Sequence, residues 1–305
     1  MIYSKTPKTF DEQILLLKQR GLIMDNIVSV GETLSNINYY RLSAYMLPFK
    51  QKNDMVYCDN FIVGTTWDNV YDLYKFDRKL RLLLLDAIER IEVAVRTQIA
   101  YTLSMKYGSH WQDNSSIFKE GNGWKYFDDI QKHIADQLKN NLSEVFIKHY
   151  REKYTSPINP PSWMCVEILY FNQLSRICDN LKDRKDVTEI SKHFALPPEI
   201  FCSWLHTLNY IRNLCAHHSR LWNRDIAIVP LKLKFSKTNI WISNPDIVQR
   251  KRMYYVFCMI SYLLKSCNST STFNTRLKNL FVDYPIVNLK YMGFPDNWEE
   301  DKFWR

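Results

Sequence analysis

The segment Phe201–His218 has a polar face made of imidazole, amide and phenol groups. At roughly 100° per residue, its large apolar side chains fall on one face of a helix and these polar ones fall on the opposite face, within roughly 60° of one another. A helix face turned to solvent usually carries Lys and Glu, yet neither occurs between Ile200 and His217. The pattern indicates a groove or an interface, and a polar network between packed helices is the alternative. The polar face consists of His206, Tyr210, Asn213 and His217.

Within this segment, Arg212, Asn213 and His217 have the spacing R-N-x-x-x-H. An imidazole such as that of His217 exchanges protons near neutral pH, and a guanidinium such as that of Arg212 stays cationic and can bind two phosphate oxygens at once. Asn213 precedes His217 by four residues, so its amide can orient the imidazole or a substrate. Around an ideal helix Arg212 lies roughly 140° from His217, so the two need not point the same way within one chain. The adjacent His218 is the alternative active imidazole.

The elements that position these residues are predicted to be helices. The sequence holds only 7 Gly and 11 Pro, which favours long helices over a turn-rich β architecture. Residues 67–107 contain neither, and their apolar side chains recur at helical spacing, which predicts one long helix. Further helices are predicted over 126–140, 162–181, 186–194, 198–218 and 248–266, with a short strand pair within 228–242.

Glu89, Glu92 and Arg96 share one face of the predicted long helix. Glu92 and Arg96 are four residues apart, so an ion pair along the helix is the simple expectation. The alternative is that Glu89 or Glu92 orients the guanidinium of Arg212 from a neighbouring helix.

Residues 1–62 are predicted to form a small helical module. Thr9 and Glu12 have the spacing of a capping box, and Gly21 suits the end of the first helix. A second helix is predicted to begin near Ser29 and to continue to about Tyr45. The rest of the chain is expected to form a helical domain over 63–285 and an irregular tail over 286–305. We therefore expect an all-α protein.

Three blocks of sequence, in this order, resemble the Abi-like abortive-infection family (AbiD and AbiF types) of the HEPN ribonuclease superfamily. They are Asn38-Tyr-Tyr-Arg-Leu-Ser-Ala-Tyr45, the pair Tyr74-Lys-Phe-Asp-Arg-Lys-Leu-Arg81 and Asp86-Ala-Ile-Glu-Arg-Ile-Glu-Val-Ala-Val-Arg96, and Arg212-Asn-Leu-Cys-Ala-His-His-Ser-Arg-Leu-Trp-Asn-Arg224. The resemblance implies a HEPN-type helical bundle that cleaves RNA without a metal in defence against phage. It also implies that Arg212, Asn213 and His217 are catalytic, and that a small structured RNA is a partner of some members.

The resemblance further implies a homodimer. Related nuclease modules bring two motifs together to form one site, and this chain holds one clear motif. No cofactor is implied. Two other functions stay open: a non-catalytic RNA-binding or regulatory protein on the same scaffold, and a toxin paired with a nucleotidyltransferase.

Positive charge is concentrated after the motif. The chain has a net charge of +9, and residues 220–252 carry eight Lys or Arg against two acids, which accounts for +6 of it. Leu231–Phe235 alternates apolar and basic residues as in a strand with one cationic face, and Trp241 could stack on a base. We expect an RNA-binding strip beside the motif; a solubilising surface, or an RNA site around Tyr39, Tyr40 and Arg41, is the alternative. The expected RNA-binding residues are Arg220, Arg224, Lys232, Lys234 and Lys237.

Other classes of function find little support in the sequence. No apolar run approaches the length of a membrane span and no secretory leader is recognisable, so a soluble cytoplasmic protein is expected. The 7 cysteines are odd in number and lack zinc-knuckle spacing, which predicts reduced, mostly buried thiols. His206, His217 and His218 have no carboxylates at ligand spacing, so no metal site is expected. Nucleophile-elbow, P-loop and H-E-x-x-H motifs are also missing.

Overall fold

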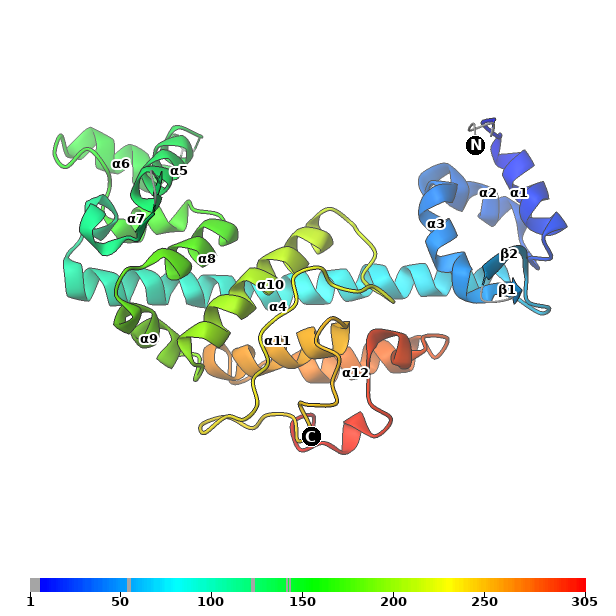
Figure 1. Cartoon of the computed structure of the whole chain (residues 1–305). Helices are drawn as coiled ribbons and strands as arrows, with labels where there is room; N and C mark the ends of the chain where they lie inside the picture. Colours follow the sequence, from blue (N-terminus) through cyan, green and yellow to red (C-terminus); the bar gives the residue numbers. More distant parts are fainter. Residues whose placement is uncertain (1–5, 54–55, 122–123, 141, 143) are drawn as a thin grey trace. The chain divides into compact units, whose positions relative to one another are not determined.

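The computed structural model describes residues 6–53, 56–121, 124–140, 142 and 144–305 and shows a mostly helical protein (Figure 1). Over these residues it contains twelve α-helices and two small two-stranded sheets, which confirms the expected all-α class. The chain divides into two compact units. The first consists of Met1–Leu80 with Lys278–Asn288, and the second of Arg81–Leu277 with Leu289–Arg305.

The first unit begins with the helix α1 (Phe10–Gln19), which has the expected cap. The Thr9 hydroxyl accepts from the Glu12 backbone N–H at 3.2 Å, and the Glu12 carboxylate accepts from the Thr9 N–H at 2.7 Å. Gly21 follows the helix end with a φ of +87°, a left-handed conformation that glycine adopts without strain. Helix α1 therefore begins and ends as the sequence predicts.

The single helix expected from Ser29 to Tyr45 is wrong, because the chain forms two. Helix α2 covers Ile27–Asn36 and helix α3 covers Tyr39–Met46. Between them Ile37 takes an extended conformation, and the Asn38 side chain accepts from the Tyr40 N–H at 2.7 Å. Asparagine is a strong N-cap, so it starts a new helix here instead of continuing the old one.

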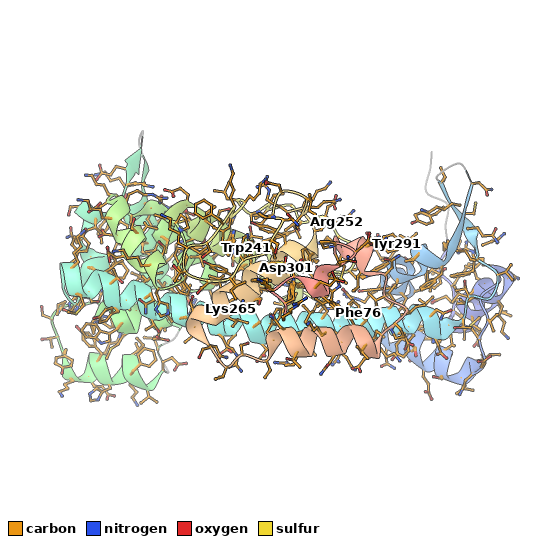
Figure 2. All side chains as sticks on the ribbon, turned by 90° about the horizontal axis from the view of Figure 1, so that it is seen from below. Phe76, Trp241, Arg252, Lys265, Tyr291 and Asp301 are labelled. Atoms are coloured by element: carbon orange, nitrogen blue, oxygen red, sulfur yellow. The ribbon has the colours of Figure 1, made fainter. Side chains whose placement is uncertain are left out.

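An unpredicted hairpin follows, made of β1 (Lys50–Asn53) and β2 (Val56–Phe61), after a 3₁₀ turn over Leu47–Phe49. The core of the first unit joins the start of helix α4 (Trp67–Tyr107) to the end of α12 (Phe273–Asp283). There Phe76, labelled in Figure 2, packs against Phe281 and Tyr284 with ring centroids about 6 Å apart.

The long helix α4 is uninterrupted over 41 residues, as the sequence predicts, and contributes to both units. Leu84, Ile91 and Val95 are fully buried in the second unit, and the helix ends before Gly108 at a φ of +88°. The second unit continues with α5 (Tyr126–Asn140), α6 (Val145–Lys153), α7 (Ser162–Glu167), α8 (Phe171–Asn180), α9 (Arg184–Lys192) and α10 (Pro198–Ala216). Helix α10 packs against α8 and α9 (Figure 1).

The single helix expected over 162–181 is broken between α7 and α8. The carbonyl oxygens of Val166 and Leu169 both accept hydrogen bonds from the guanidinium of Arg96 on α4, and the Val166 carbonyl also accepts from the Leu169 N–H at 3.3 Å. Arg96 is buried, so these carbonyls find in it the donor that water would otherwise supply. The break places the first turn of α8 against α10.

The strand pair expected within 228–242 is also wrong, because these residues form an extended segment without strands. Side chains satisfy its backbone: the Leu231 N–H donates to Ser203 Oγ at 2.8 Å, and the Leu233 N–H donates to the Tyr255 hydroxyl at 2.9 Å. The Leu231 carbonyl accepts from Trp204 Nε1 at 3.0 Å. The segment therefore packs on α10 and α11 (Met253–Cys267) and needs no partner strand.

Helix α11 is the centre of the second unit, with every residue from Met253 to Leu264 buried. A helix that is apolar all round belongs in a core. Its Tyr254 packs against Trp304 of the C-terminal tail, and Trp304 packs in turn against Trp298. The remaining short elements are η2 (Trp111–Asp113), η3 (Ser115–Ile117), β3 (Glu120–Gly121), β4 (Trp124–Lys125), η4 (Leu289–Met292) and η5 (Trp298–Glu300). Among the residues placed by the structure, no helix has an apolar stretch long enough to cross a membrane.

Candidate active site at the end of helix α10

Helix α10 ends within the R-N-x-x-x-H sequence. Ala216 is its last helical residue, and His217 is the C-cap, whose backbone N–H donates to the Asn213 carbonyl at 2.9 Å. The Ser219 N–H then donates to the Leu214 carbonyl at 2.8 Å, and the His218 N–H to the Cys215 carbonyl at 3.1 Å. This pair of bonds is a Schellman motif, which ends the helix at this point.

His218 occupies the left-handed position of this motif with a φ of +56°. Glycine is the usual residue there, because a side chain in this conformation is strained by about 1 kcal/mol or more. The turn leaves both imidazoles exposed at the helix end. His217 therefore sits at the edge of the fold on a fixed backbone, where a large substrate can reach it.

The polar face of α10 is accessible along its length in the single chain. His206 and His217 are exposed, and Tyr210 and Asn213 are half-buried. The opposite face is buried, including Trp204, Leu208 and Ile211. The predicted division of the helix into an apolar and a polar face is confirmed. The polar face stays at least partly accessible and is not fully covered by the rest of the described chain.

The side chains of Arg212 and Asn213 open onto a pocket of about 270 Å³ between α10 and the start of α8. Arg212 Nη1 lies 3.5 Å from Asn213 Oδ1. The other lining residues are Tyr170, Phe171, Asn172 and Asn209. This set was not predicted from the sequence, although Asn209 lies four residues before Asn213 and so shares its face. Nothing in the sequence indicates that Tyr170 and Asn172 approach it.

A second, open pocket of about 570 Å³ lies on the other side of Arg212 and is acidic. Glu89 and Glu92 of α4 line it together with Arg212, so both expected neighbours of the motif do lie near it. Glu92 Oε1 accepts from Arg96 at 2.9 Å, which is the simple ion pair that the spacing predicts. The remaining acids that line this pocket are Asp86 and Glu167.

Burial raises the pKa of the Glu92 carboxyl, while the charges of Arg96 and then Arg212 act in the opposite direction. The two readings of Glu92 are thus compatible, because it pairs with Arg96 and also lies within electrostatic reach of Arg212. The structure therefore brings Arg212 together with Asn213 and the carboxylates of α4. His217 lines neither pocket and lies on the exposed turn that follows.

The basic residues expected to bind RNA fall into two groups. Arg220 and Arg224 follow the motif directly, are half-buried, and form no ion pair with any residue whose position the structure gives. Lys232, Lys234 and Lys237 instead line a pocket with Leu196, Pro197 and Ile200 at the first turn of α10. This helix of 19 residues is about 28 Å long, so these lysines lie far from the motif. The expectation that they form a strip beside the motif is therefore wrong.

Trp241 is not available for base stacking, which corrects the expected role of its ring. It is buried and packs among Trp204, Tyr255, Tyr262 and Phe303, and its Nε1 donates to the Leu233 carbonyl at 2.8 Å. Trp241 and Lys265, which Figure 2 labels, both contact Phe303. An apolar ring with one N–H donor suits such a core position, and the sequence alone does not distinguish it from a surface ring.

Part of the basic segment is neutralised locally. Lys232 lies 2.5 Å from Asp246, and Asp225 contacts Lys251 at 3.2 Å and Arg252 at 3.0 Å. The two acids of the segment are thus paired, and the surplus charge rests on the remaining cations.

The thiols take no part in the site. Five of the seven cysteines are buried, as expected, and burial raises the pKa of the Cys202 thiol to about 12, so it stays protonated at neutral pH. No group of three or more His, Cys, Asp or Glu side chains that could hold a metal ion is found among the residues described.

The fold and this helix end define a class: a helical protein that presents an Arg, an Asn and a His at the exposed end of one helix. The model of the Abi-like protein family matches residues 32–223, which is more than half of the chain, and the chain belongs to this family. The match includes α4, both sides of the Arg212 pocket and the motif. No curated protein and no solved structure shows significant similarity to the chain.

Proposed function

We propose that the protein is a metal-independent endoribonuclease of the HEPN type that acts in abortive infection against phage. Membership of the Abi-like family indicates an abortive-infection role. The observation that carries the ribonuclease proposal is the end of α10: the Schellman turn exposes His217 immediately after Arg212 and Asn213, whose side chains open onto a pocket. A buried structural network would not leave these groups accessible.

The proposed reaction uses the nucleophile that RNA itself carries. His217 removes the proton from a 2′-hydroxyl, and the 2′-oxygen forms a bond to the adjacent phosphorus while the bond from phosphorus to the 5′-oxygen breaks. The leaving 5′-oxygen takes up a proton, so the products are a 2′,3′-cyclic phosphate and a 5′-hydroxyl. Arg212 stabilises the charge on the phosphoryl oxygens, and Asn213 orients the imidazole or the substrate.

A homodimer would complete the site. Arg212 faces α4 and α8, whereas His217 lies on the turn beyond the helix, and a second copy of α10 across a two-fold axis would supply the missing partner of each. The accessible polar face from His206 to His217 supports this arrangement, because it offers a surface without Lys or Glu side chains that would repel an identical copy. Arg220 and Arg224 would bind the RNA backbone next to the motif, whether in a substrate or in a small structured RNA; their support is that they follow the motif directly and are half-buried cations.

The test is the chemistry of the cut. Purified protein is incubated in EDTA with a short RNA that it cleaves, and with the same RNA carrying a single 2′-deoxy substitution at the cleaved nucleotide. We expect 2′,3′-cyclic phosphate and 5′-hydroxyl ends from the first and no cleavage at that position in the second. Cleavage at the deoxy position would rule out the proposed nucleophile, and tight binding without cleavage would favour the regulatory RNA-binding alternative.

The dimer has its own test. Arg212→Ala and His217→Ala chains are mixed, and the activity of the mixture is compared with that of each variant alone. If each site draws on two chains, mixing restores part of the activity. A fully active monomer by light scattering at micromolar concentration would contradict the shared site.

A further inference from the structure

A preformed pocket of about 480 Å³ lies at the end of α10 opposite the motif. One wall is the connection between α9 and α10, with Ala195, Leu196 and Pro197, and continues to Ile200 in the first turn of α10. The other wall is the extended segment from Lys232 to Thr238. Its volume lies in the range of small-molecule sites, which is roughly 300–1,000 Å³.

The hydroxyl of Tyr262 on α11 holds the two walls together. It donates to the Ala195 carbonyl at 2.8 Å and lies 2.7 Å from Ser236 Oγ in the opposite wall. Since one hydroxyl has one proton, Ser236 is the donor in the second bond. Tyr262 is fully buried and Ser236 is half-buried, so these bonds are partly shielded from water. The width of the pocket is therefore fixed before any ligand enters.

Ala195 has a φ of +54° because it occupies the left-handed position of the Schellman motif that ends α9. The Ala195 N–H donates to the Lys192 carbonyl at 3.0 Å, and the Leu196 N–H donates to the Ser191 carbonyl at 3.3 Å. This motif turns the chain from α9 into the wall of the pocket, and the Tyr262 hydrogen bond to the Ala195 carbonyl ties the turn to α11.

The lining of the pocket combines an apolar surface with positive charge. Leu196, Pro197, Ile200 and Leu233 supply the apolar part, and Phe235, a residue that is 68% exposed, lies beside them. Among the residues whose positions are described, four lysines, at positions 192, 232, 234 and 237, line the pocket, and no acidic side chain does. Lys192 pairs with Glu189 and Lys232 with Asp246, but such exposed ion pairs are weak and can exchange for a ligand anion.

We infer that this pocket binds a nucleoside phosphate, with the base on Phe235 and the apolar wall and the phosphate on the lysines. A base presents a flat apolar face to an aromatic ring, and the phosphate presents the charge that ammonium groups neutralise. The ligand is either a free nucleotide or one nucleotide of a single-stranded RNA, since both offer this chemistry. The inference does not depend on the proposed ribonuclease activity, because it concerns binding at the other end of α10.

Binding to the full-length protein is measured with three probes: adenosine 5′-monophosphate, inorganic phosphate and octanoate. We expect the nucleotide to bind at least about tenfold more tightly than either of the others, because only it uses the ring and the charges together. Equal binding of phosphate and nucleotide would show a simple anion site and overturn the inference. Octanoate binding as tightly as the nucleotide, or no nucleotide binding at millimolar concentration, would also overturn it.

The Phe235→Ala variant separates the base from the phosphate. Phe235 is exposed, so its loss leaves the core intact, and we expect about tenfold weaker nucleotide binding with unchanged phosphate binding. The matched control is Phe10→Ala, which removes another exposed phenylalanine and should change neither. Equal nucleotide binding by Phe235→Ala and the native chain would show that the base does not bind to Phe235 and would overturn the inference.

The source of the nucleotide is decided by competition. An eight-nucleotide RNA is added to protein carrying bound fluorescent nucleotide, in the His217→Ala background so that a cleavage reaction cannot interfere. Displacement at a lower concentration than free nucleotide requires identifies an RNA strand as the natural occupant. No displacement identifies a free nucleotide. Both results keep the pocket, and neither depends on whether His217 is catalytic.

Discussion

The two ends of helix α10 have opposite chemistry. At its C-terminal end Arg212 lies between an amide-lined pocket and an acidic one, and the histidines are exposed on a turn. At its N-terminal end the described residues that line a pocket form apolar walls and include four lysines and no acid. The first end holds groups that exchange protons and stabilise charge, whereas the second holds groups that bind a charged ligand. One rigid helix thus fixes the distance between a proposed reactive site and a proposed binding site.

The acids around Arg212 affect how RNA can bind at this end of the helix. The pocket beside Arg212 is lined by four carboxylates and two arginines, and this surplus of acids disfavours the approach of RNA as a polyanion, so part of the affinity has to come from elsewhere. The lysine pocket, Arg220 and Arg224 are candidate sources. The comparison therefore predicts that substitutions at the C-terminal end change the rate of cleavage, and that substitutions at the N-terminal end change affinity.

The largest expected effect is that of Arg212→Ala. Losing the cation that stabilises the phosphoryl charge should lower the cleavage rate at saturating RNA by at least ~10²-fold. Arg212→Lys should recover little, because lysine lacks the planar pair of donors. The control is Arg151→Ala, which removes an exposed arginine on α6 and should leave the rate unchanged. A native cleavage rate in Arg212→Ala would show that the C-terminal end of α10 takes no part in the reaction.

The next effect concerns the support of the Arg212 pocket. Arg96→Met removes the guanidinium that donates to the Val166 and Leu169 carbonyls and that pairs with Glu92, so the free energy of unfolding should fall by about 3 kcal/mol. Urea denaturation followed by circular dichroism measures it. Arg90→Met, which removes an exposed partner of Asp86, should change it by less than about 1 kcal/mol. Equal stability of the two variants would mean that Arg96 does not hold the break between α7 and α8.

A smaller effect is expected from the lysine end. The double variant Lys234→Gln with Lys237→Gln should reduce the slope of log affinity against log salt for single-stranded RNA by about 1.4. It should leave the cleavage rate at saturating RNA unchanged, because neither lysine lies near the motif. Lys139→Gln, at an exposed position on α5, is the control for a general loss of charge. A lower cleavage rate at saturating RNA in the double variant would contradict the assignment of catalysis to one end of α10 and of affinity to the other.

The smallest effect is that of His218→Gly. Glycine relieves the left-handed strain at the helix end, so the free energy of unfolding should rise by up to about 1 kcal/mol. If His217 is the active imidazole, cleavage by this variant stays within a few-fold of the native rate. Loss of cleavage in a folded His218→Gly protein would assign the proton transfer to His218.

The long-range parts of this account are the ones that the sequence could not supply. The spacing of apolar residues predicts α4 correctly, and the Thr9 and Glu12 side chains predict the start of α1, because both signals are local. The break between α7 and α8 depends on Arg96, some 70 residues away, and the extended segment after Ile228 depends on hydroxyls of α10 and α11. No local pattern encodes these contacts.

The candidate site shows the same limit. The polar face of α10 follows from helical periodicity, and so does the place of Asn213 one turn before His217. The pocket partners Tyr170 and Asn172 come from the start of α8, and the spacing of residues along α10 does not predict them. Trp241 and the lysines were misplaced for a related reason: alternation along Leu231–Phe235 resembles a strand, but side chains of other helices determine which residues are buried.

The central claim is that the end of α10 carries the reaction, and the most direct measurement is the rate of RNA cleavage in EDTA by three proteins. These are the native chain, His217→Ala and His149→Ala, the last being a control that removes an exposed histidine on α6. We predict that the native chain and His149→Ala cleave at equal rates, and that His217→Ala is slower by at least ~10²-fold. Equal cleavage by His217→Ala, or a strict requirement for a divalent metal ion, would contradict the account.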